Sequence, residues 1–62
     1  MCDTTAYARA ESGDETVLEN VDVIRPGDGV VYLRNLFGEE LTFAGRIVEI
    51  SLMKHRLVLE RA

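Results

Sequence analysis

Short runs of alternating apolar and polar residues follow one another along this chain of 62 residues. In one of them, Val21 and Val23 alternate with Asn20 and Asp22, which is the period of a strand with one buried face. The pattern predicts five strands, over residues 2–10, 16–24, 30–37, 41–52 and 55–60.

Turn signals separate these runs, at residues 12–14, 25–28, 38–40 and 53–56. The strongest is the stretch Arg25-Pro26-Gly27-Asp28. Proline presets φ at the second position of a type II turn, and glycine supplies the positive φ that the third position needs. The sequence therefore predicts a tight turn centred on Pro26 and Gly27.

Alternation also predicts which side chains face the core. In the third run, one face would carry Val31, Leu33 and Phe37, and the other would carry Val30, Tyr32 and Arg34. In the last run, Leu57 and Leu59 would point inward.

The run over residues 41–52 changes phase part-way. Leu41, Phe43 and Ile47 share one phase, whereas Val48, Ile50 and Leu52 share the opposite one. Such a switch requires a bulge or a bend, and Gly45 is the expected place because glycine in a strand often marks one. A helix over residues 46–53 is the alternative, which the β-branched side chains in this stretch oppose.

Five short strands with tight connections predict an all-β fold, a small, strongly bent antiparallel sheet or barrel forming one domain over residues 1–62. A chain of this size buries only about 60% of its unfolded surface, so its stability margin is thin. A single cysteine rules out an intramolecular disulfide, which leaves a metal ion or a partner subunit as additional support.

Composition limits the classes of protein to which the chain can belong. A hydrophobic fraction of 47% and a charged fraction of 29% are typical of a folded domain. No apolar run approaches the roughly 20 residues of a membrane span, and no signal peptide is evident, so we expect a cytoplasmic protein. The net charge of −4 disfavours nucleic-acid binding, since Lys54-His55-Arg56 is the only basic cluster.

The sequence offers little for catalysis. The one histidine and the one cysteine are far apart, so a thiolate–imidazole pair of Cys2 and His55 would require the fold to join them. Four aromatic residues allow either a stacking platform for RNA or a place in the core, and their strand spacing favours the core. They are Tyr7, Tyr32, Phe37 and Phe43.

Cys2 is the most informative residue. It is either a small apolar side chain that opens the first strand or a metal ligand. If Met1 is removed, the α-amine and the thiolate of Cys2 would close a five-membered chelate ring around a metal ion. If Met1 is retained, the Met1 amine, the deprotonated Cys2 amide and the Cys2 thiolate would close two fused rings. Nitrogen and sulfur donors in such a site suit Ni(II) or Cu(II). Two chains related by a two-fold axis would form a symmetric site and a homodimer.

Four stretches of the chain resemble the small CooT-type nickel-binding proteins. They are the MC start, a short strand with AY, the stretch LENVDVIRPGDGVVYLRNLFGEE and the stretch IVEISLMKHRLVLE. The resemblance covers nearly the whole chain. It implies an accessory protein of carbon monoxide dehydrogenase maturation, a homodimer and a small Sm-like β-barrel. It also implies that the cysteine directly after the initiator methionine, here Cys2, is the metal ligand. It assigns no role to His55, which we interpret as a solvated side chain on a turn.

These observations predict a cytoplasmic, non-enzymatic nickel-binding accessory protein, a metal carrier or maturation factor for a nickel enzyme. Ni(II) would be held by Cys2, with Met1, at a homodimer interface, and the apoprotein of the nickel enzyme would be a partner. The alternative is an Sm-like barrel without a metal role that binds RNA or another protein, since the family was earlier labelled as RNA-binding.

Overall fold

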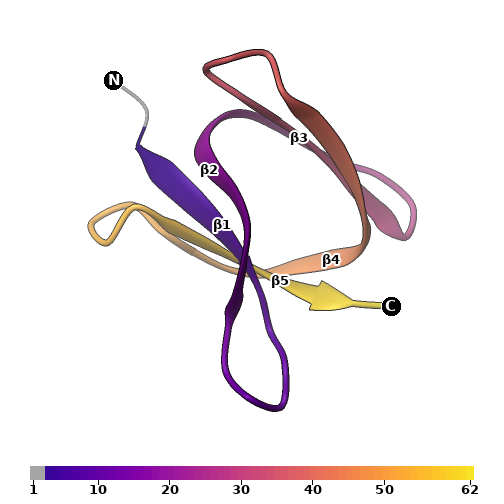
Figure 1. Ribbon diagram of the computed structural model, residues 1–62. Helices are drawn as coiled ribbons and strands as arrows, with labels where there is room; N and C mark the ends of the chain where they lie inside the picture. Colours follow the sequence, from indigo (N-terminus) through magenta and orange to yellow (C-terminus); the bar gives the residue numbers. More distant parts are fainter. Residues whose placement is uncertain (1–2) are drawn as a thin grey trace.

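The computed structural model describes residues 3–62, which form a closed barrel of five strands (Figure 1). The strands are β1 (Thr4–Ala8), β2 (Glu15–Pro26), β3 (Val30–Asn35), β4 (Glu40–Ser51) and β5 (Arg56–Arg61). The predicted all-β class and the bent sheet or barrel are confirmed. Residues 46–51 continue β4, so the helical alternative for residues 46–53 is wrong.

The barrel closes between its first and last strands. Consecutive strands pair antiparallel, whereas β1 and β5 pair parallel, with Thr5 opposite Arg56 and Ala8 opposite Leu59. The parallel pair follows from the topology, because strand direction alternates along a chain of hairpins and the first and fifth strands therefore point the same way. Closure places the start of β1 directly beside the start of β5.

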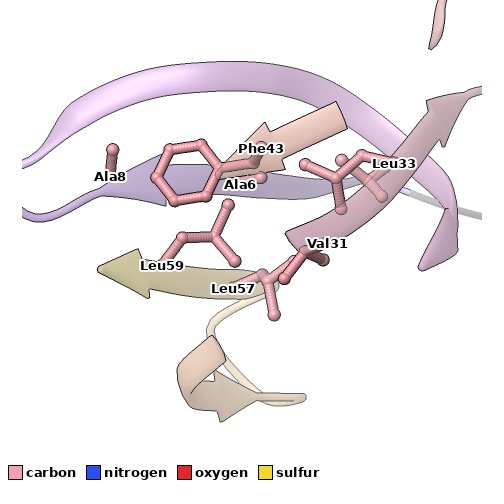
Figure 2. Close-up of a cluster of buried hydrophobic side chains, with 8 residues drawn as sticks. Ala6, Ala8, Val31, Leu33, Phe43, Leu57 and Leu59 are labelled. Atoms are coloured by element: carbon pink, nitrogen blue, oxygen red, sulfur yellow. The ribbon is translucent and has the colours of Figure 1, made fainter. Parts of the chain in front are cut away.

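The core is built from inward-facing side chains of all five strands, several of which Figure 2 shows pointing toward one another. Leu57 and Leu59 are fully buried, as predicted, and so are Val31 and Leu33. The buried cluster consists of Ala6, Ala8, Val21, Val31, Leu33, Phe43, Leu57 and Leu59. Small residues on β1 leave room for the Phe43 ring and the two leucines of β5.

The β3–β4 turn (Leu36–Glu39) departs from the prediction. β3 ends at Asn35, so Phe37 does not join Val31 and Leu33 on the inner face and is instead 76% exposed. Asn35 is buried, and its side-chain oxygen accepts hydrogen bonds from the backbone N–H groups of Phe37 and Glu39, at 3.0 and 2.9 Å. Asn35 therefore takes the last inward-facing position of β3. Its side-chain amide turns the chain before Phe37, which the alternation would have placed inward.

The β2–β3 turn lies further along the chain than predicted. Pro26 is the last residue of β2 and pairs with Val31, and the positive φ falls on Gly29 at 71°, not on Gly27. Proline lacks a backbone N–H but is tolerated at the end of a strand. The prediction of a turn centred on Pro26 and Gly27 is therefore wrong, and the Asp28-Gly29 pair makes the reversal.

The irregularity in β4 is also displaced from its predicted position. The register against β5 shifts between Ile47 and Glu49, not at Gly45. Gly45 is instead a point of close approach: its φ is 155°, and a Cβ there would lie 2.1 Å from the Glu60 carbonyl oxygen. Beyond the shift, Ile50 faces mostly outward, and Leu52 is 82% exposed in the β4–β5 turn (Leu52–His55).

Candidate metal site at the start of the first strand

Cys2 and Met1 lie outside the described residues. The structure does describe what surrounds the next residues of the chain. Asp3 precedes β1, and the β4–β5 turn lies beside it, because the Thr5 N–H donates a 2.9 Å hydrogen bond to the carbonyl oxygen of His55. The parallel closure of the barrel thus brings His55 next to the residue that follows Cys2.

The His55 side chain contacts Asp3 directly. The imidazole Nδ1 lies 2.9 Å from the Asp3 carboxylate oxygen Oδ1, and both side chains are more than half exposed. His55 has a positive φ of 53°, which histidine adopts more readily than most residues with a Cβ. The backbone of this turn and the Asp3 carboxylate together hold the ring at the start of β1.

Sequence reasoning missed Asp3 as a candidate residue. Its carboxylate is one of eleven acidic groups, and nothing in the local pattern distinguishes it. Among residues 3–62, no group of three or more His, Cys, Asp or Glu side chains could hold a metal ion.

The basic cluster Lys54-His55-Arg56 is largely neutralised. Arg56 donates a 2.8 Å hydrogen bond to Asp14 and lies over the Tyr7 ring, 5.2 Å from its centroid. His55 is paired with Asp3. The cluster therefore offers little of the free positive charge that phosphate binding requires.

The four aromatic residues do not form a stacking platform. Phe43 is in the core, as predicted, whereas the Tyr7 and Tyr32 rings are each covered by a guanidinium group. The Tyr32 hydroxyl donates a 2.9 Å hydrogen bond to Glu40, and this bond raises the pKa of Tyr32 above its ordinary value. Phe37 is the exposed member of the four, and the prediction that it belongs to the core is wrong.

A hollow of about 530 Å³ lies between the β2–β3 turn and residues 45–47 of β4. Glycine and aliphatic residues make up most of its wall, and Arg46 is its charged lining residue. The Arg46 guanidinium is engaged by Glu60 at 2.8 Å. This hollow does not bring together a set of acid, base or nucleophilic groups.

Comparison with known proteins decides the family. Residues 1–60 match the family model described as CO dehydrogenase accessory protein CooT. The chain belongs to the CooT family. No curated protein matches it. A crystal structure of a proposed CooT from Carboxydothermus hydrogenoformans is similar, with 31% sequence identity, 98% of each chain covered and a TM-score of 0.88.

The family model describes accessory proteins of CO dehydrogenase, which agrees with the resemblance seen in the sequence. The match begins at Met1 and so includes Cys2. No helix of residues 3–62 is long and apolar enough to cross a membrane.

Proposed function

We propose that this member of the CooT family is a cytoplasmic, non-enzymatic nickel carrier that binds Ni(II) through the Cys2 thiolate, with a nitrogen donor from Met1 or from Cys2 itself. The observation that carries the proposal is the family match, which extends over the Met1-Cys2 pair. CO dehydrogenase is a nickel enzyme, so an accessory protein with a thiolate and an amine at one position has an evident cargo. Nickel is here a substrate to be passed on to the apoprotein.

The surroundings of β1 support a site that can release its metal. Asp3 and His55 are both more than half exposed, so the described chain begins on the surface of the barrel and not in its core. A thiolate and amine pair fills at most part of a square-planar site, because Ni(II) in such geometry takes four donors. A second copy of the chain supplies the remaining two donors.

Exposed apolar side chains near the start of β1 support a homodimer. We define the amino-terminal rim as Leu36 and Phe37 of the β3–β4 turn with Leu52 and Met53 of the β4–β5 turn. All four are more than half exposed, and Met53 reaches 92%. Large exposed apolar groups gathered on one side of a small soluble protein commonly mark an interaction surface.

Hydrogen bonds place both turns of the rim around β1. Thr4 pairs with Val21 of β2, and the neighbouring Asn20 accepts a 3.0 Å hydrogen bond from the Leu36 N–H. On the other side of β1, Thr5 is bonded to His55. Figure 1 shows the start of β1 between these two turns. A second copy docked on this rim would bring two Cys2 residues together and complete the nickel site.

Titration with Ni(II) tests the metal proposal. Wild-type protein should develop a near-ultraviolet thiolate-to-nickel charge-transfer band that saturates at one Ni(II) per two chains. Cys2→Ser should lack the band and lose most of the affinity, because the hydroxyl is a far weaker ligand than a thiolate. Equal binding by the two proteins would refute a site at Cys2. A circular dichroism spectrum of Cys2→Ser identical to wild type is the control for folding.

A further inference from the structure

The outer side of β3 carries two arginines around a tyrosine. Tyr32 and Arg34 alternate with buried core residues and so point outward, and Arg25 of β2 pairs with Tyr32 in the strand register. The Arg25 guanidinium carbon lies 5.9 Å from the centroid of the Tyr32 ring. We define the cationic face as the outward side chains of Arg25, Val30, Tyr32 and Arg34.

The two arginines of the cationic face differ from arginines elsewhere in the barrel. Three others each lie 2.8–3.0 Å from a carboxylate oxygen, namely Arg46, Arg56 and Arg61. Neither Arg25 nor Arg34 takes part in an ion pair among residues 3–62, although both are exposed. Their guanidinium groups therefore keep their hydrogen-bonding capacity for a carboxylate from outside the chain.

The charges around Tyr32 leave this face positive. Glu40, through its hydrogen bond and its charge, raises the pKa of Tyr32, whereas the charges of Arg34 and Arg25 lower it. Two guanidinium groups thus stand beside one carboxylate, and that carboxylate already accepts a 2.9 Å hydrogen bond from the Tyr32 hydroxyl. The chain as a whole has a net charge of −4, so a positive face on it is a local feature.

The cationic face continues into the hollow between the β2–β3 turn and β4, because Val30 belongs to both. The hollow has a volume of about 530 Å³ and a mostly apolar wall, so it can accept an apolar side chain of a partner. Arginine and tyrosine beside an apolar pocket are typical of the energetically important part of a protein–protein interface.

We propose that the cationic face binds an acidic segment of the apoprotein that receives the nickel, and that an apolar side chain of this segment enters the hollow. This inference rests on the proposed function and adds to it the docking surface and the chemistry of the partner. Carboxylates of the segment would accept paired hydrogen bonds from the two guanidinium groups. Arg34 and Val30 are four positions apart on β3, roughly 13 Å at about 3.3 Å per residue, which is the separation expected between the acidic and apolar side chains of the segment.

Two other occupants fit this face less well. A second copy in a two-fold dimer would set the cationic face against the same face, and a positive surface is not complementary to itself. RNA binding relies on several phosphate contacts and on free aromatic rings, whereas this face offers two cations and the Tyr32 ring lies under Arg25.

Binding of nickel-free CO dehydrogenase to this protein, measured by biolayer interferometry, tests the inference. Arg25→Gln and Arg34→Gln should each weaken binding about tenfold, because each removes charge-assisted hydrogen bonds. The double variant should bind more weakly than either. Binding by wild type should also weaken as the salt concentration rises.

Two controls separate docking from charge and from folding. Ser12→Glu lowers the net charge by the same single unit on the β1–β2 loop, outside the cationic face, and should bind the apoprotein as wild type does. The two arginines are exposed and have no ion pair among the described residues, so their variants should keep a thermal unfolding midpoint close to that of wild type.

Wild-type affinity in the double variant, or a wild-type protein that does not bind the apoprotein, would overturn the inference. Dissociation of the homodimer by the double variant would overturn it in favour of self-association, and loss of oligoribonucleotide binding in that variant alone would overturn it in favour of RNA. The Ni(II) charge-transfer band of Cys2 should persist in the arginine variants. Absence of this band from wild type would instead refute the proposed function itself.

Discussion

At the scale of single residues, Gly45 is the glycine at which an added Cβ would collide with the backbone. A Cβ at this position would lie 2.1 Å from the Glu60 carbonyl oxygen and 2.7 Å from Cε2 of Phe43, and φ is 155°. The carbonyl is part of the β4–β5 ladder and cannot move without disturbing the barrel. The sequence correctly indicated a special role for this glycine but placed the register shift here, because spacing alone does not distinguish close approach from a bulge.

Gly45→Ala should therefore destabilise the protein by about 3 kcal/mol or more, which combines overpacking with backbone strain. Urea unfolding followed by circular dichroism measures the change. Gly27→Ala is the control: its Cβ would meet Val30 at an ordinary 3.4 Å and φ is not positive, so its effect should stay within about 0.5 kcal/mol. Equal stability of Gly45→Ala and wild type would contradict the close approach.

A second prediction at this scale concerns Glu60. Its hydrogen bond from Arg46, at 2.8 Å, lowers the pKa of the Glu60 carboxyl below the ordinary 4.5. A lowered folded-state pKa means that the pair stabilises the fold above the unfolded-state pKa and loses this effect as pH falls through the folded value. Carboxyl-detected NMR titration should show the Glu60 pKa returning to its ordinary value in Arg46→Gln. An identical pKa in both proteins would show that Arg46 is not the cause.

At the scale of elements, the β3–β4 turn shows how one buried polar residue controls a surface. Asn35 accepts bonds from two backbone N–H groups and donates a 2.6 Å hydrogen bond from Nδ2 to the Glu39 carboxylate. This turn holds Phe37 outward on the amino-terminal rim. Alternation predicted the strand itself, but the sequence pattern could not show that an asparagine would satisfy the turn and occupy the inward position.

Asn35→Ala should leave the Phe37 and Glu39 amides without their acceptor and cost about 1–3 kcal/mol, since each hydrogen bond contributes about 0.5–1.5 kcal/mol to stability. Hydrogen exchange of these two amides should accelerate. Exchange of the Leu33 amide, in the middle of β3, should change only as much as the free energy of global unfolding changes. Unchanged exchange at Phe37 and Glu39 would show that the side chain does not organise the turn. Ser12→Ala, in the exposed β1–β2 loop, is the control and should change little.

At the scale of the whole molecule, closure of the barrel creates the candidate site. Residues 3 and 55 are distant in sequence, yet the parallel pairing of β1 with β5 joins them. Five strands in hairpin order already imply that pairing once the sheet closes, so the meeting of Asp3 with His55 could in principle be deduced from strand count. The contact between the two side chains could not, because Asp3 is one of eleven acidic residues and nothing in the local sequence distinguishes it.

The amino-terminal rim makes a prediction about assembly. Phe37→Glu and Met53→Glu each add a charge to a proposed apolar interface of a chain that already carries −4, so each should shift the dimer toward monomer. Sedimentation velocity at matched concentrations measures the shift. Ser12→Glu adds the same charge on the β1–β2 loop, away from the rim, and should leave association unchanged. Dissociation in all three variants would point to net charge and not to the rim.

Native mass spectrometry in the presence of Ni(II) examines the nickel site at Cys2 in a single spectrum, which reports subunit count, metal count and the presence of Met1. Wild-type protein should give a species of two chains with one nickel ion, and Cys2→Ser should lose the bound nickel. Nickel retained by Cys2→Ser at the same stoichiometry, or a wild-type protein that stays metal-free, would contradict a nickel site at Cys2.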